Sequence, residues 1–137
     1  MSQENLEILR RALASPLEKP EDFFAILDED VVWDPGDTFP SGKCYGVGEV
    51  VTFFRQWVGA FEDFRFEVME SIDAGSCVFV HMRQWGCGKA SGATAHRDFW
   101  QVWIFFEGKV VRFVHKPDRR EALIAAGLPE QDAHADS

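Results

Sequence analysis

The sequence predicts an α+β domain, in which a curved and mostly antiparallel sheet wraps around N-terminal helices and leaves a cone-shaped pocket between the layers. Apolar residues recur at helical spacing up to residue 60, and from Phe61 onward they alternate as in long strands. The chain of 137 residues also contains 13 phenylalanines, 5 tryptophans and 1 tyrosine. That is more than a flat two-layer core needs, so aromatic side chains are expected to line the pocket.

The first part of the chain is expected to hold three helices. Leu6, Leu9 and Leu13 share one face of a helix over 5–13, which Ser15-Pro16 ends. Pro20 begins a short helix over 21–27, and the spacing of apolar residues predicts another over 48–60. Between these two helices lie a short strand over 31–33 and the loop DPGDTFPSGKCYG, which is too rich in Pro and Gly for regular structure.

The second part alternates and predicts four strands, over 64–69, 77–85, 94–106 and 109–115. Glu107-Gly108 is typical of a tight hairpin turn between the last two. A closing helix is expected over 118–126, ended by Gly127 and Pro129. We therefore expect one domain over 1–129 and a flexible polar tail over 130–137.

Charge and cysteine usage narrow the class of protein. The net charge of -9 argues against a nucleic-acid partner, which would require a dense basic patch. No apolar segment approaches the ~20 residues of a membrane span, and no signal peptide is visible, so a cytoplasmic protein without membrane association is expected. Cys44, Cys77 and Cys87 show no metal-binding spacing and are expected to be reduced thiols.

Four stretches carry a resemblance to a known family: DEDVVWDP, the Gly-Val-Gly helix start followed by FFRQW, FFEGKVVRF and DRREALIAAGL. Their order and spacing over 4–127 resemble the nuclear transport factor 2-like superfamily, and within it the SnoaL-like polyketide cyclases and the relatives of ketosteroid isomerase. The resemblance implies a cystatin-like α+β barrel and catalysis without a cofactor or metal. Because this fold also carries binding and assembly functions, the activity has to be argued from the site.

Asp34 is the first candidate catalytic residue. In relatives of ketosteroid isomerase, the aspartate that removes a proton next to a carbonyl precedes a proline, and Trp33-Asp34-Pro35 is similar. In a dry pocket, poor solvation would raise the pKa of this carboxyl and make it a general base. The alternative is that Asp34 caps the turn at Pro35-Gly36.

The sequence departs from the isomerase pattern in its hydrogen-bond donors. Those relatives use a tyrosine of the first helix and a protonated aspartate of the third strand. Here the only tyrosine, Tyr45, lies elsewhere, and the third strand offers Trp100 and Gln101. Gln101 could still donate a hydrogen bond to a substrate oxygen, but a steroid-type double-bond shift is not expected.

Two histidines are the remaining acid–base candidates. Alternation places His81 and Arg83 on one face of their strand and Phe113 and His115 on one face of another. If both faces look inward, the histidines could transfer protons and Arg83 could hold an oxyanion. Alternatively, each histidine is structural, on the other face of the sheet or at a dimer contact. One slip of register would exchange His81 for Met82 and Gln101 for Trp100.

The other two histidines are weaker candidates for a functional role. His96 is expected at the rim or in a salt bridge, and His134 in the tail is expected to have no role. The separations of residues 81, 96 and 115 match no helical metal motif, so we expect no metal site.

An apolar substrate would contact the aromatic residues of the pocket wall. We expect Trp33, Phe54, Trp57, Trp103 and Phe113 there, although the same spacing also fits residues of a solid core.

Three functions therefore remain open. The first is a cofactor-free acid–base catalyst, of isomerase, cyclase or dehydratase type, on a small hydrophobic carbonyl compound. The second is non-catalytic binding of a small lipophilic ligand, and the third is an interaction module whose pocket is filled by its own side chains. A homodimer through the sheet face away from the helices is expected in each case.

Overall fold

The structure is a computed structural model that describes residues 2–14, 20–37, 39 and 42–129. Within them the elements follow in the order α1 (Ser2–Leu13), α2 (Glu21–Ala25), β1 (Leu27–Asp34), β2 (Cys44–Tyr45), α3 (Gly46–Gly59), β3 (Phe61–Asp73), β4 (Cys77–Gly88), β5 (Thr94–Phe106), β6 (Lys109–Lys116) and α4 (Arg119–Ala125). The tail expected over 130–137 and the helix end expected at Ser15-Pro16 lie outside these residues. None of the described helices is long and apolar enough to cross a membrane.

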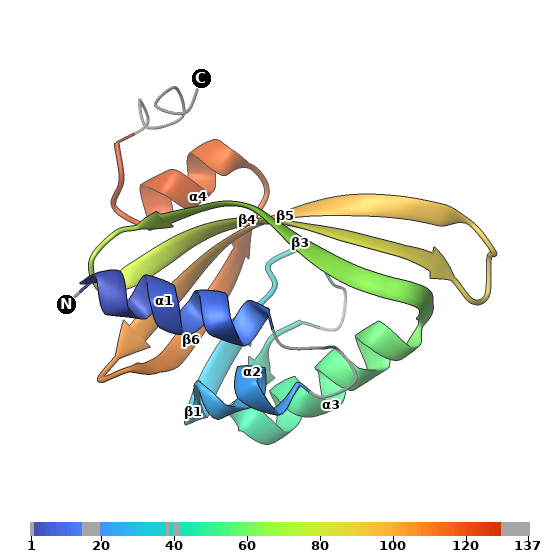
Figure 1. The fold of residues 1–137 in the computed structure, drawn as a ribbon, viewed down its shortest axis with the longest axis horizontal. Helices are drawn as coiled ribbons and strands as arrows, with labels where there is room; N and C mark the ends of the chain where they lie inside the picture. The colour runs from blue at the N-terminus through green and yellow to red at the C-terminus, as the bar shows by residue number, and fades with distance from the viewer. Residues whose placement is uncertain (1, 15–19, 38, 40–41, 130–137) are drawn as a thin grey trace.

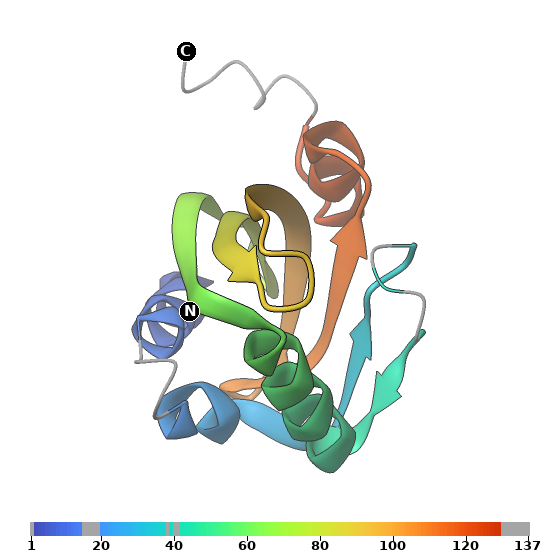
Figure 2. The same ribbon diagram turned by 90° about the vertical axis from the view of Figure 1, so that its right-hand side faces the viewer.

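The strands form one curved, unclosed sheet in the order β2-β1-β6-β5-β4-β3. Neighbouring strands are antiparallel except β1 and β6, which run parallel. The sheet wraps around α1, α2 and α3, whereas α4 lies on its other side (Figure 1; Figure 2). The predicted α+β architecture, with a curved sheet around N-terminal helices, is confirmed.

Three strand boundaries differ from the prediction because pairing across the sheet overrides local signals. β1 begins at Leu27, inside the predicted helix, because Leu27 pairs with Val110 of β6. The short β2 lies in the predicted loop, where it pairs with the end of β1. β3 begins at Phe61, opposite Gly88, which extends the hairpin beyond the predicted alternation.

Alternation along the strands produces an apolar cluster on each face of the sheet. On the concave face Val80, Met82 and Trp103 pack in one cluster with residues of α1–α3 such as Leu9 and Phe54. On the convex face a smaller cluster packs under α4; it contains Cys77, Phe79, Val102, Ala122 and Leu123. α4 begins at a capping residue, since Asp118 accepts a hydrogen bond from the Glu121 N–H.

The two edges of the sheet differ in length. β2 has only 2 residues, and the other edge, β3, has 13. The register of β3 against β4 shifts twice, between Glu62 and Arg65 and between Val68 and Glu70. At the second shift Met69 is an extra residue, so Glu70 contacts Arg119 of α4 while Ser71 contacts Arg10 of α1.

Candidate ligand-binding site

The concave face and the three N-terminal helices enclose a narrow apolar hollow. Strand residues of the concave face form one wall, and α1, α2 and α3 form the other. A cavity of about 40 Å³ remains in it, lined by Leu13, Phe23, Trp33, Val50, Phe54, Trp57, Phe66, Met82, Gln101, Trp103 and Phe113, among others. All the residues predicted for the pocket wall are among these, and so is Gln101, whereas Arg83 is not. This volume is far smaller than the ~150 Å³ of a cavity that binds benzene.

Aromatic rings fill most of the hollow. Trp103 and Phe113 stack at 4.3 Å between ring centroids, and Trp33 stacks on the other side of Phe113 at 5.2 Å. The ring of Phe39, from the loop after β1, lies 5.0 Å from Trp57 and 6.0 Å from His115. Phe39 therefore packs against both a residue of the cavity lining and His115, a position that no periodic pattern in the sequence indicated.

A chain of hydrogen bonds crosses the floor of the hollow. The Trp103 Nε1–H donates to Gln101 Oε1 over 3.0 Å, and Gln101 Nε2 lies 3.2 Å from His115 Nε2. Gln101 and His115 face each other on neighbouring strands, and both are buried, with 4% of each exposed. The sequence indicated Gln101 as a hydrogen-bond donor and His115 as an acid–base residue, each on its own. The register of β5 against β6 brings the two side chains together.

His115 is neutral at physiological pH. Burial, reinforced by the positive charge of Arg97 and opposed by Asp34, lowers the pKa of its imidazole to about 3. Its Nδ1 has no hydrogen-bond partner within the described part of the chain, and the same holds for Trp33 Nε1. The two rings lie 5.7 Å apart, so two buried nitrogens without partners belong to neighbouring residues.

Asp34 lies on the opposite face from Trp33. Its Oδ2 accepts a hydrogen bond from Arg112 Nη2 over 3.0 Å and lies 3.9 Å from Lys43 Nζ. Its Oδ1 accepts from the Gly36 N–H over 3.0 Å. These contacts match the turn-capping alternative, and Asp34 is absent from the lining of the hollow.

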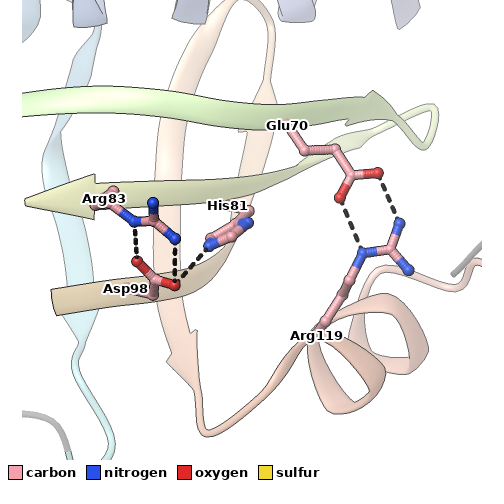
Figure 3. Close-up of polar contacts among 5 residues, drawn as sticks. All are labelled: Glu70, His81, Arg83, Asp98 and Arg119. Atoms are coloured by element: carbon pink, nitrogen blue, oxygen red, sulfur yellow. Dashed lines mark hydrogen bonds and ion pairs between the residues drawn. The ribbon is translucent and has the colours of Figure 1, made fainter. Parts of the chain in front are cut away.

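His81 and Arg83 also lie on the convex face, as the placement of Met82 in the hollow requires. Arg83 makes two hydrogen bonds to Asp98, of 2.6 and 3.1 Å, and His81 Nε2 lies 3.3 Å from Asp98 Oδ2 (Figure 3). The Arg83 guanidinium, with a smaller contribution from His81, holds the pKa of the Asp98 carboxyl below its usual value. The His81 ring also stacks on Trp100 at 5.1 Å.

A second ion pair lies near this cluster. Glu70 of β3 accepts two hydrogen bonds from Arg119 of α4, of 2.9 and 2.6 Å (Figure 3). No pattern in the sequence indicated a role for Asp98, Glu70 or Arg119. The cross-strand pairing of Arg83 with Asp98 follows from the register of the β4–β5 hairpin, which alternation alone does not fix.

The remaining histidines lie away from the hollow. His96 is exposed, and its ring lies 4.8 Å from that of Trp85. His134 lies outside the described residues.

Comparisons with known proteins agree with this architecture. A sequence model of the SnoaL-like domain family matches residues 14–113. Among curated proteins no match was found.

Solved structures share the fold over nearly the whole chain. An NTF2-like protein of unknown function from Burkholderia pseudomallei is 24% identical, with a TM-score of 0.74 over 88% of this chain and 95% of its own. TerC, co-crystallised with polyporic acid, is 20% identical, with a TM-score of 0.72 over 90% and 98%. A putative SnoaL-like polyketide cyclase from Jannaschia sp. is 14% identical, with a TM-score of 0.72 over 93% and 94%. These likenesses show the NTF2-like fold, and the match over residues 14–113 shows that the chain belongs to the SnoaL-like domain family.

Proposed function

We propose that the chain binds a small, flat, mostly apolar compound with a carbonyl oxygen in the hollow between α1–α3 and the sheet. The observation that carries this proposal is that buried nitrogens of Trp33 and His115 have no hydrogen-bond partner among the described residues and lie beside a wall of aromatic rings. Buried polar groups are normally hydrogen-bonded, and a carbonyl oxygen would accept from an N–H at this position. The likeness to TerC, which was co-crystallised with polyporic acid, supports a small organic ligand.

The ring of such a ligand would take the place of the Phe39 ring. Phe39 lies within 5.0 to 6.1 Å of Trp57, Phe53, Trp33, His115 and Phe99. These rings would surround a ligand in the same way, and the ligand's oxygen would then lie on the side of His115. The cavity of about 40 Å³, whose lining includes the Phe39 neighbours Trp33 and Trp57, is too small for a ring unless Phe39 moves.

Binding can be tested with two ligands of nearly the same shape, acetophenone and α-methylstyrene, in which a methylene replaces the carbonyl oxygen. Phe39→Ala should bind both more tightly than the unaltered chain, because the deleted ring leaves a ready cavity. Acetophenone should bind the variant more tightly than α-methylstyrene because only the ketone accepts a hydrogen bond. Binding is measured by calorimetry and by the rise in unfolding temperature.

The matched control is Phe106→Ala, which removes a phenylalanine that is 65% exposed and lies outside the hollow. Its affinities should equal those of the unaltered chain. Failure of both ligands to bind Phe39→Ala would overturn the proposal.

Acid–base catalysis on the bound carbonyl compound, as an isomerase, cyclase or dehydratase, is the second candidate. The observation that favours it is a neutral imidazole beside the hollow, which can donate to a carbonyl oxygen as an enol forms. Likeness to a putative polyketide cyclase also supports it. Asp34 and His81 lie on the convex face, so His115 is the acid in this candidate, and the base is not assigned.

Exchange of the acetophenone methyl protons in D2O, followed by NMR, tests this second candidate. The chain should accelerate the exchange above the buffer rate, and His115→Phe should remove the acceleration. Exchange at the buffer rate would contradict acid–base catalysis and leave ligand binding as the function of the hollow.

We further propose that two copies associate through the part of the convex face that α4 leaves uncovered. Half-buried Trp85 lies there beside Arg83, and half-buried Trp100 packs against the edge of the cluster under α4. Light scattering should give twice the chain mass, and Trp85→Glu should give the mass of one chain. A single-chain mass for the unaltered protein would contradict the dimer.

A further inference from the structure

We propose that Gln101, itself held by Trp103, is a positioning residue that keeps His115 in the Nδ1–H tautomer. The tautomer is a property of the free protein, whereas the use of this N–H to bind a ligand oxygen rests on the proposed function. The inference follows from three buried side chains that contact each other in sequence, and each contact fixes the next.

The first step is the orientation of the Gln101 amide. An indole N–H can only donate, so the group 3.0 Å from Trp103 Nε1 must be an acceptor. That group is the amide oxygen of Gln101. The amide nitrogen consequently points toward the other neighbour, His115.

The second step is the protonation of His115. The Gln101 amide nitrogen carries only donor hydrogens, and it lies 3.2 Å from His115 Nε2. A stable contact at this distance requires that Nε2 accept, and therefore that it carry no proton. In a neutral imidazole the remaining proton is then on Nδ1. Burial of the ring keeps it neutral.

The third step is where this N–H lies. Cε1 separates Nδ1 from Nε2, so an N–H on Nδ1 points in a different direction from the Gln101 contact, and Nδ1 has no partner among the described residues. His115 also lines a depression of about 480 Å³, whose other lining residues are Gly36, Asp37, Arg97, Asp98, Phe99, Trp100, Lys116 and Pro117. The Arg97 guanidinium lies 5.3 Å from the Phe99 ring, and its positive charge acts on His115. A ligand oxygen that accepts a hydrogen bond would therefore bind at His115, which contacts Trp33 of the aromatic hollow and lines the polar depression.

This placement specifies the ligand more closely than the hollow does. An apolar ring would lie against Trp33 and Trp57, and an oxygen would accept from His115 Nδ1–H toward the depression. At His115 the positive charge of Arg97 outweighs the negative charge of Asp34, which favours an oxygen that carries partial or full negative charge, as in a ketone, an enolate or a carboxylate. A basic nitrogen at the same position would be disfavoured.

The proton is located by long-range proton–nitrogen NMR on the 15N-labelled chain without ligand. The signal of His115 should show a protonated Nδ1 and an unprotonated Nε2. A proton on Nε2, or an imidazolium at pH 7, would overturn the proposal regardless of any ligand result.

Two substitutions test the role of Gln101. In Gln101→Glu the carboxylate can only accept, so the proton of His115 should move to Nε2 or the ring should become an imidazolium. In Trp103→Phe nothing orients the amide, so both tautomers should appear. Gln84→Glu is the matched control, since Gln84 is a buried glutamine of the concave face on β4. Gln84→Glu should leave His115 in the Nδ1–H form. The same tautomer in the unaltered chain and in all three variants would refute the positioning role of Gln101.

Ligand selectivity is the second readout. Combined with Phe39→Ala, Gln101→Glu should lower the preference for acetophenone over α-methylstyrene about ten-fold, the equivalent of one hydrogen bond, while α-methylstyrene binds as before. Absence of binding with the Nδ1–H form present would disprove the proposed function alone. Ligand binding by a chain whose His115 carries its proton on Nε2 would disprove only the positioning role of Gln101.

Discussion

The two faces of the sheet use the same kinds of polar residue in opposite ways. On the concave face His115 and Gln101 are buried, uncharged and linked to an indole. On the convex face His81 lies beside the carboxylate of Asp98, which also binds Arg83, and Glu70 binds Arg119. Removal from water explains the difference, because a buried face tolerates a neutral histidine, whereas a partly solvated face tolerates charges in pairs.

The largest expected difference between the faces is in packing. Trp103→Ala should lower the free energy of unfolding by about 3–5 kcal/mol, because the 2%-exposed ring leaves a cavity and deprives Gln101 of its donor. Trp100→Ala, the matched change on the half-buried convex side, should cost less than about 2 kcal/mol. Urea denaturation measures both. Equal losses would mean that the faces do not differ in packing.

The second difference is a pH dependence that arises from the concave face. The unfolded chain binds a proton at His115 below about pH 6.5, whereas the native chain binds it only near pH 3. Stability should therefore fall by up to ~1.4 kcal/mol for each pH unit from 6.5 toward 3. His115→Phe should flatten this part of the curve, and the exposed His96→Phe should not. Parallel curves for all three proteins would contradict the low pKa.

A smaller pH dependence of stability is expected from the convex face, where it arises from an ion pair and not from burial. The pKa of Asp98 is lower in the native chain than in the unfolded chain, because Arg83 and His81 stabilise the carboxylate. Its contribution is complete above pH 4 and is lost as the pH falls through the native pKa. Asp98→Asn should cost about 1–2 kcal/mol at pH 7, discounted for partial exposure, and less at pH 3. A cost that does not change with pH would indicate a loss of packing instead.

The smallest effect is expected at Asp34. Its side chain is 23% exposed, and its partner Arg112 is 41% exposed. Asp34→Asn should therefore cost no more than about 1 kcal/mol and should leave the affinity of Phe39→Ala for acetophenone unchanged. A loss of affinity, measured by calorimetry, would place this carboxylate in the site after all.

The parts of the fold that could be predicted are those that local pattern determines. The alternation over 94–106 matches the limits of β5, and the spacing of α3 places Phe54 and Trp57 in the hollow. Alternation alone does not determine the face on which His81 lies, because a shift of one residue exchanges the faces of a strand. Phe39 comes from a loop, where nothing periodic indicates a ring that packs against Trp57 and His115.

The contacts of Asp98 also could not be predicted from local pattern. Its role depends on Arg83, fifteen positions earlier in the chain, and this pairing arises only when the β4–β5 hairpin closes in its register. The contacts of Gln101 with His115 likewise require the β5–β6 register.

The unequal edges of the sheet bear on how the protein avoids aggregation. An unpaired edge strand is a template for fibre-like growth when it is long, regular and apolar. Here β2 offers only 2 residues, and β3 is interrupted by two register shifts and carries charged residues such as Glu62, Arg65 and Glu67. The shortness of β2 and the register shifts and charges of β3 therefore disfavour a continuous ladder between neighbouring molecules.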